Sequence, residues 1–314
     1  MGRENREEIR MKKEILTISS NFDGLELSAA IYAPEGDVKG IVQMVHGMSE
    51  HKERYFSFME YLAEAGYACI SHDHRGHGAS VKAPEDLGYM YDETGQAIVE
   101  DVHQLTVYMK ERFPGMPVYL FGHSMGALIV RVYLRKYDGD IDKLIVCGAP
   151  NKNPAVGAAK ALIKVLKAFK SDRHVSKLMF DLSLGGFNKS VKNPRTSCDW
   201  LSVNEANVDE YLACPLCGVG FTLNGYASLM GVMDSCFKED GWAMKNSQLP
   251  IYFIAGSDDP CIGGKDGWLD SQVFLKKRGY SNVDGKLYDG YRHEILKESI
   301  AEEVFGDVLA FIEK

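Results

Sequence analysis

The chain has 314 residues, 45% hydrophobic and 25% charged, a balance that predicts a folded globular protein and excludes extensive disorder. Its formal net charge of -8 argues against a nucleic-acid-binding protein, because phosphate neutralisation requires a basic surface. Residues 1–12 mix Arg, Glu and Lys without the apolar core of a signal peptide, and no later run is apolar enough to span a bilayer. We therefore expect a cytoplasmic protein whose residues 1–12 form a frayed extension.

Two strands are predicted first, over Glu14–Ser20 and Leu25–Ala33, and the turn-prone residues between them indicate an antiparallel hairpin. From residue 41 onward, short apolar runs typical of strands alternate with runs of helical periodicity. This alternation predicts an α/β protein with a parallel sheet covered by helices. The runs are Ile41–Val45, Tyr55–Ala65, Tyr67–Ser71, Ala97–Arg112, Val118–Phe121, Ala127–Tyr137 and Ile141–Cys147.

The alternation stops between Asn151 and Asn246 and then resumes. The resumed runs are the strand Ile251–Ala255, the helix Asp266–Arg278, the strand Val283–Tyr288 and the closing helix Ile300–Ile312. We expect residues 13–150 and 247–314 to form one α/β core with eight strands. Residues 151–246 are predicted to be an inserted, mainly helical cap.

One predicted cap helix carries lysines on one face, at residues 160, 164, 167 and 170, and apolar side chains on the other. Two interpretations follow from this pattern. The apolar side could meet an acyl chain or a lipid surface while the lysines stay in water. It could equally pack over the core as in an ordinary amphipathic helix, and neither interpretation excludes the other.

The most specific motif is G-x-S-x-G at residues 122–126, directly between the predicted strand Val118–Phe121 and the helical run that follows. Strand, abrupt turn and helix are the context of a nucleophile elbow. The flanking glycines matter because side chains beside so tight a turn would collide with the strand or the helix. Ser124 is therefore the predicted nucleophile.

A nucleophilic serine needs a histidine base and an orienting carboxylate, and in this kind of fold the chain order is serine, acid, histidine. The strand Ile251–Ala255 leads into a loop with Asp258 and Asp259, and the last predicted strand leads into a loop with His293. Adjacent side chains point in different directions, so only one aspartate can meet the imidazole. We predict Asp259, which precedes Pro260, as the acid, with Asp258 as the alternative, and His293 as the base.

The tetrahedral intermediate of acyl transfer needs two backbone N–H donors. Met125, directly after the nucleophile, is expected to supply one. The loop after the third strand begins His46, Gly47, Met48, which makes the Met48 amide the second expected donor of the oxyanion hole.

Other clusters of metal-binding residue types do not predict a metal. The first histidine cluster, His46 with Glu50 and His51, has one residue too many for the H-x-x-E-H zinc pattern. Cys214 and Cys217 form a C-x-x-C pair, but no second pair completes a zinc site and the redox βαβ context is missing. We expect no metal and no cofactor, and the seven cysteines are interpreted as reduced thiols. His72, His74 and His77 are likewise interpreted as structural.

Together these motifs resemble the α/β-hydrolases of the monoacylglycerol lipase and lysophospholipase group. The resemblance rests on H-G-M-S-E-H at residues 46–51 with Arg54 and Tyr55, on D-H-R-G-H-G at residues 73–78, and on the elbow. It implies the α/β-hydrolase fold, a mostly parallel eight-stranded sheet with a helical cap over the elbow. The family's aspartate before proline maps onto Asp259, and its His-Glu pair maps onto His293 and Glu294.

The predicted cap also resembles bacterial members of the group, at residues 199–202 and around Tyr211 and Pro215. Where the resemblance implies an aspartate before Pro215, this chain has Cys214. We therefore do not carry over any polar contact of that aspartate.

The resulting interpretation is a serine hydrolase that cleaves carboxylic esters through an acyl-enzyme. Its substrates are expected to be monoacylglycerols, lysophospholipids or smaller acyl esters, with transient lipid-surface contact through the cap. One alternative is an aminopeptidase of the prolyl iminopeptidase type, in which Glu205, Asp209 and Glu210 would bind the substrate amine. The other is a non-catalytic protein of the same fold that binds a small ligand.

Overall fold

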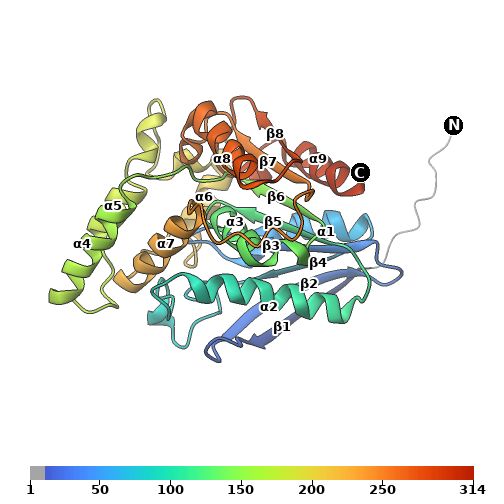
Figure 1. Ribbon diagram of the computed structural model, residues 1–314. Coiled ribbons are helices and arrows are strands. Elements are labelled where there is room, and N and C mark those ends of the chain that lie inside the picture. The colour runs from blue at the N-terminus through green and yellow to red at the C-terminus, as the bar shows by residue number, and fades with distance from the viewer. Residues whose placement is uncertain (1–10) are drawn as a thin grey trace.

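The computed structural model describes residues 11–314, and Figure 1 shows a single sheet flanked by helices. Its strands are β1 (Met11–Ser19), β2 (Glu26–Pro34), β3 (Gly40–Val45), β4 (Tyr67–His72), β5 (Val118–His123), β6 (Lys143–Cys147), β7 (Ile251–Gly256) and β8 (Val283–Tyr288). Among these residues the sheet has eight strands in the order β1-β2-β4-β3-β5-β6-β7-β8. The pairs β1–β2 and β2–β4 are antiparallel, and the others are parallel. The predicted mostly parallel eight-stranded sheet is confirmed.

The side chains of the edge strand β1 alternate between a buried and an exposed face. Leu16 and Ile18 pack against the core, whereas Ile15 on the other face is 57% exposed. A strand buried on one face only shows this period of two, as edge strands of antiparallel pairs commonly do. The predicted hairpin at one edge of the sheet is therefore present.

The predicted frayed extension, residues 1–12, falls mostly outside the described part of the chain. Its last two residues, Met11 and Lys12, are in the β1–β2 ladder. The hairpin thus begins three residues earlier than the sequence predicted.

Strands β3, β4 and β5 are buried along their whole length. Their continuous apolar runs are typical of strands covered on both faces. Helices α1 (Phe56–Glu64) and α9 (Ala301–Glu313) pack on one face, and α2 (Gln96–Arg112), α3 (Met125–Tyr137) and α8 (Gly264–Arg278) pack on the other. In β5, for example, Leu120 belongs to one apolar cluster and Phe121 to the opposite one.

The segment between β6 and β7 is mainly helical, as expected for residues 151–246. It contains α4 (Val156–Phe169), α5 (Lys177–Ser183), α6 (Glu205–Ala213) and α7 (Leu223–Cys236), and α4 and α5 lie along one side of the molecule in Figure 1. Helix α7 approaches the core closely, since a Cβ atom on Gly231 would lie 2.0 Å from the Thr94 carbonyl oxygen. The division into core and cap stays a prediction.

No helix within residues 11–314 has both the length and the apolar character needed to cross a membrane.

Candidate active site

Ser124 occupies the strained turn that the elbow motif predicts. β5 ends at His123, α3 begins at Met125, and Ser124 between them has φ 55° and ψ -116°. A non-glycine residue at positive φ costs on the order of 1–3 kcal/mol and persists only where its surroundings impose it. The Ser124 amide donates to the Cys147 carbonyl at 3.0 Å, which anchors the turn to the end of β6.

The glycines of the motif lie where no side chain fits. A Cβ atom on Gly122 would lie 2.5 Å from the Gly126 carbonyl oxygen, and one on Gly126 would lie 2.0 Å from the Val45 carbonyl oxygen. The helix can therefore start directly against β3 and β5 only because both residues are glycine. The strand, turn and helix expected at residues 122–126 are all present.

The imidazole of His293 and the carboxylate of Asp259 are in direct contact. Nδ1 of His293 and Oδ2 of Asp259 are 2.8 Å apart, and both residues are 2% exposed. The other carboxylate oxygen of Asp259 accepts from the Cys261 amide at 2.8 Å. Asp258 is exposed and accepts from Ser257. Of the two neighbouring aspartates, the structure thus places Asp259 against the imidazole.

Because Nδ1–H donates to Asp259, Nε2 is the ring nitrogen of His293 that carries the lone pair, and Sγ of Cys261 lies 4.0 Å from it. Within residues 11–314 no direct hydrogen bond joins Ser124 to His293. The two residues are connected through His123, whose Nε2 donates to the His293 carbonyl at 3.2 Å. Gly148 borders the imidazole as well, since a Cβ atom there would lie 3.2 Å from Nδ1 of His293. Catalytic hydrogen bonds are often long before substrate binds.

The loop after β3 carries the expected oxyanion donor Met48. Gly47 in this loop faces the elbow, because a Cβ atom there would lie 3.1 Å from Cβ of Ser124. The Met125 amide belongs to the first turn of α3, where amides have no acceptor within the helix. The loop and the start of the helix thus both lie next to the serine.

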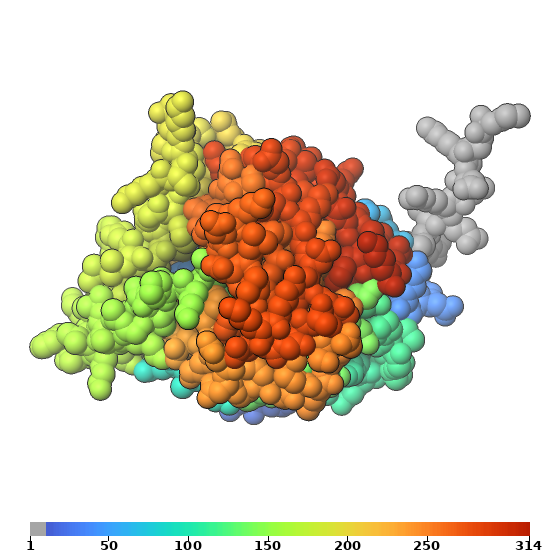
Figure 2. All heavy atoms as spheres, turned by 45° about the horizontal axis from the view of Figure 1, so that its top comes forward, coloured from blue at the N-terminus to red at the C-terminus, as the bar shows by residue number. Residues whose placement is uncertain are grey.

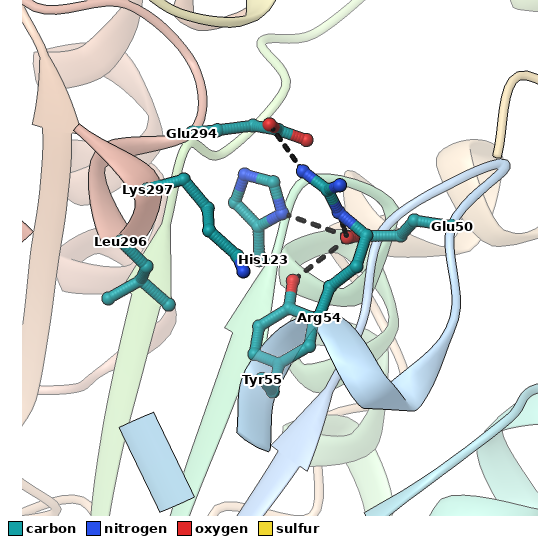
Figure 3. Close-up of a pocket in the computed structure, with 7 residues that line it drawn as sticks. All are labelled: Glu50, Arg54, Tyr55, His123, Glu294, Leu296 and Lys297. Atoms are coloured by element: carbon teal, nitrogen blue, oxygen red, sulfur yellow. Dashed lines mark hydrogen bonds and ion pairs between the residues drawn. The ribbon is translucent and has the colours of Figure 1, made fainter. Parts of the chain in front are cut away.

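A buried carboxylate holds that loop in place. Glu50 Oε1 accepts from the Gly47 amide at 2.5 Å, from the Tyr55 hydroxyl at 2.9 Å and from Nδ1 of His123 at 3.2 Å. Figure 3 shows the guanidinium of Arg54 between this carboxylate and that of Glu294. Together they line a cavity of about 20 Å³, room for a water molecule and too small for an acyl chain.

Burial lowers the pKa of His123, but the hydrogen bond and the negative charge of Glu50 outweigh it, so the pKa of His123 is raised. Burial likewise opposes the charge on Glu50, yet His123 and Arg54 hold the pKa of that carboxyl well below its usual range. Both ring nitrogens of His123 face acceptors, the Glu50 carboxylate and the His293 carbonyl, so both donate and the pair is ionic. The sequence alone indicated no site role for Glu50, Arg54 or His123, although four charged residues lie within residues 50–54.

The histidines predicted to be structural form a packed cluster behind the loop. His46 and His74 have ring centroids 4.0 Å apart, and those of His46 and His77 are 5.1 Å apart. Nε2 of His77 accepts from the Ser49 amide at 3.2 Å, and Nε2 of His46 accepts from the His74 amide at 2.9 Å. Each accepts through an unprotonated nitrogen, so the cluster positions the loop only in its neutral form.

The C-x-x-C pair lies in an environment that the sequence did not predict. Cys214 and Cys217 are partly exposed, and Sγ of Cys214 is 3.3 Å from Nε2 of His51. The departure from the family pattern at position 214 therefore brings a thiol to the loop after β3. Cys69 and Cys147, by contrast, are buried in the strands β4 and β6.

The segment at residues 199–202 lies against the His293 loop. The Trp200 ring centroid is 5.1 Å from that of His293, and the Arg292 guanidinium donates to the Asp199 and Ser202 carbonyls at 2.7 and 3.0 Å. The Glu294 amide donates to the Leu201 carbonyl at 2.8 Å. The resemblance of this segment to bacterial relatives thus falls on residues that contact the candidate site.

Known proteins are similar in sequence to this chain along nearly its whole length. The monoacylglycerol lipase of Mycolicibacterium smegmatis is 26% identical, with 92% of this chain and 93% of that protein covered. The human monoglyceride lipase is also 26% identical, with 92% of this chain and 87% of that protein covered.

A solved structure shares the arrangement in space. A thermostable carboxyl esterase from Bacillus coagulans, solved in complex with glycerol, has 27% identity and a TM-score of 0.89, with 96% of this chain and 98% of that chain covered. The family model described as Hydrolase_4, serine aminopeptidase S33, matches residues 36–300. The chain therefore belongs to this family of α/β-hydrolases, within its monoacylglycerol lipase and lysophospholipase group.

Proposed function

We propose that the protein hydrolyses carboxylic esters with Ser124 as nucleophile, His293 as base and Asp259 as orienting acid. The observation that carries the proposal is the contact between His293 and Asp259, two buried residues that arrive from the ends of β8 and β7. The strained backbone of Ser124 at the end of β5 supports it independently. Relatives named for ester hydrolysis cover almost the whole chain, which favours the same chemistry.

In the proposed first step, Oγ of Ser124 attacks the ester carbonyl and Nε2 of His293 takes its proton. The Asp259 carboxylate holds Nδ1–H and stabilises the imidazolium that forms. The backbone amides of Met48 and Met125 donate to the developing oxyanion. As the ester C–O bond breaks, Nε2–H of His293 protonates the leaving oxygen, so that the alcohol departs and an acyl-enzyme remains on Ser124.

In the second step water attacks the acyl-enzyme, with His293 again as base, and releases the carboxylic acid. Every step uses side chains and amides of the chain itself. Glu50 and His123 act as positioning residues, because they hold the loop of Met48 and the carbonyl of His293.

The test is the turnover of a nitrophenyl ester by wild-type protein and Ser124→Ala. Removing a catalytic nucleophile typically lowers kcat by on the order of 10⁶-fold. We expect a loss that leaves no turnover above background, with unchanged circular dichroism. Full turnover by purified Ser124→Ala would contradict the proposal.

For the substrate we propose a monoacylglycerol, a lysophospholipid or a smaller acyl ester. The names of the relatives support this class, and the glycerol-bound esterase has the same architecture. Measuring kcat/KM for glycerol esters of graded acyl length tests it. The expected result is a maximum at one acyl length, and equal values at every length would argue against a pocket shaped for acyl chains.

An aminopeptidase is the second candidate, because the family model that matches residues 36–300 is that of serine aminopeptidases. The carboxylates considered for amine binding, Glu205, Asp209 and Glu210, are all exposed, and Asp209 pairs with Arg195 at 2.7 Å. These carboxylates therefore lie on the surface and do not line a pocket. Monoacylglycerol hydrolysis without proline anilide hydrolysis is the expected result.

We further propose that the protein touches lipid surfaces through α4 and α5. Ile163 of α4 packs into the core, while Val165 and Phe169 of the same helix and Leu182 of α5 are 56%, 83% and 64% exposed. Figure 2 shows the yellow-green atoms of this segment at the left edge of the molecule. The helix thus packs on the core and still presents apolar side chains to solvent, which supports the proposed contact.

Vesicle flotation with phosphatidylcholine liposomes tests this contact. Wild-type protein is expected to float with the vesicles, and Phe169→Ser combined with Leu182→Ser is expected to reduce the bound fraction. Soluble nitrophenyl ester turnover should stay unchanged in that variant. Equal vesicle binding by both proteins would overturn the proposal.

A further inference from the structure

Three metal-ligand side chains outside the proposed catalytic site converge between the loop after β3 and the segment after α6. One ligand atom each from His51, Cys214 and Cys217 lie within 4.8 Å of one another. We propose that these three residues bind a thiophilic divalent cation of the zinc class. This site is independent of the proposed ester hydrolysis.

The chain around the two cysteines is shaped for such a ligand pair. The Cys217 amide donates to the Cys214 carbonyl at 3.1 Å, so the backbone reverses and brings both sulfurs to one side. Gly218 follows at φ +67°, which allows the chain to leave the turn at once. C-x-x-C is a common spacing for zinc ligands.

The third ligand is already oriented. Nδ1 of His51 donates to Oε2 of Glu53 at 2.5 Å, so Nε2 is the nitrogen that faces Cys214, 3.3 Å from its sulfur. A carboxylate that fixes the far nitrogen is the usual partner of a metal-binding imidazole. The His51 side chain is 12% exposed, which leaves a path for an ion from solvent.

Two thiolates and an imidazole favour zinc over magnesium or calcium, which prefer oxygen ligands. The two thiolate charges would balance those of a divalent ion. Three protein ligands leave the fourth tetrahedral position for solvent or an external ligand.

The three ligands come from two parts of the chain, the loop after β3 and the segment after α6, that are already joined by hydrogen bonds. The Gly218 amide and the Tyr211 hydroxyl donate to the Ser49 carbonyl at 2.9 and 3.1 Å, and the Ser49 hydroxyl donates to the Val219 carbonyl at 2.7 Å. A bound cation would add a metal tether between the segment after α6 and the loop that carries Met48. The consequence is a fold that is stabilised by the ion at this junction.

Cobalt provides the test, because Co²⁺ bound to thiolates in a tetrahedral site gives an intense charge-transfer band and intense visible bands. Full-length protein, kept reduced, is titrated with Co²⁺ and then with Zn²⁺. We expect one Co²⁺ per chain with thiolate bands, displacement by Zn²⁺, and a rise of several degrees in the thermal midpoint with Zn²⁺.

The variants locate the ion. Cys214→Ser and Cys217→Ser should each lose the thiolate bands or weaken them with a large loss of affinity, and Glu53→Gln should bind about tenfold more weakly. Cys198→Ser, a partly buried cysteine outside the cluster, is the matched control and should bind as wild type.

A wild-type spectrum without thiolate bands would overturn the proposal without any variant. Bands that persist in the Cys214→Ser, Cys217→Ser double variant would also overturn it. So would bands that disappear in Cys261→Ser, because Cys261 groups with Asp259 and His293 in the proposed catalytic site.

Discussion

At the residue scale, two neighbouring aspartates with the same chemistry have different environments. Asp259 is buried and accepts from His293 and from the Cys261 amide, whereas Asp258 faces solvent. From the sequence the choice between them rested on the proline that follows, since neighbouring side chains cannot both reach one imidazole. The geometry supplies what the sequence could not, namely which carboxylate lies against the ring.

This difference predicts opposite outcomes for two matched substitutions. Asp259→Asn should lower kcat for a soluble ester by on the order of 10⁴-fold, because the imidazole loses the acceptor that fixes its tautomer. Asp258→Asn should stay close to wild type. Steady-state kinetics of both variants decides the matter, and equal losses would show that Asp259 has no special role.

The charged pair of Glu50 and His123 gives a second prediction at this scale. Removing one partner of a buried ion pair leaves the other charge uncompensated and typically costs about 3–5 kcal/mol. Glu50→Gln should therefore lower the free energy of unfolding by roughly 3 kcal/mol. Exposed Glu205→Gln is the control for urea unfolding, and similar midpoints for the two variants would contradict the ionic assignment.

At the element scale, the elbow depends on contact between α3 and the strands behind it. The strand, the turn and the helix were predictable because their periodicities change within a few residues. The contact of Gly126 with the Val45 carbonyl was not, since the two residues are far apart in sequence and only packing brings β3 under the helix.

Two glycine substitutions test this contact. Gly126→Ala should destabilise the protein and lower turnover, because its Cβ atom would lie 2.0 Å from the Val45 carbonyl oxygen. Gly157→Ala in α4 has no atom within 4 Å of the new Cβ and should stabilise by about 0.4–1 kcal/mol through the unfolded chain. The thermal midpoints of the two variants are compared. A Gly126→Ala variant with wild-type midpoint and turnover would contradict this account, because it would mean that the helix can move away from β3.

At the scale of the whole molecule, the sequence predicted the order of strands and helices and the three residues proposed for catalysis. It did not predict the buried ionic network or the meeting of His51 with Cys214. Local patterns reveal strands, helices and tight turns, because these depend on neighbours in the chain. Contacts between His51 and Cys214, 163 residues apart, depend on how the segment after α6 folds back onto the core.

The histidine cluster makes global stability depend on pH. Burial, the largest influence, lowers the pKa of His46 and His72 from 6.5 to about 3, that of His77 to about 4, and that of His74 well below 6.5. Below pH 6.5 these histidines bind protons in the unfolded chain but stay neutral in the folded protein. The free energy of unfolding should therefore fall as the pH drops from about 6.5 toward 4, by ~1.4 kcal/mol per pH unit for each histidine.

Urea unfolding at a series of pH values checks this slope. The two ring nitrogens of His72 lack hydrogen-bond partners within the described residues. His72→Leu removes one proton taken up on unfolding, so the free energy of unfolding should depend less steeply on pH, by the contribution of one histidine. His174→Leu, at an exposed position, is the control and should keep the wild-type slope. A slope unaffected by His72→Leu would contradict the neutral cluster.

The most direct test of the proposed relay is covalent labelling of the reduced, folded protein with a fluorophosphonate, followed by mass analysis of its peptides. Only an activated serine reacts quickly with this reagent. We predict one label per chain on Ser124, none in Ser124→Ala, and much slower labelling in Asp259→Asn than in Asp258→Asn. A wild-type protein that stays unlabelled, or that carries the label on another residue, would contradict the assignment and favour a ligand-binding protein of the same fold.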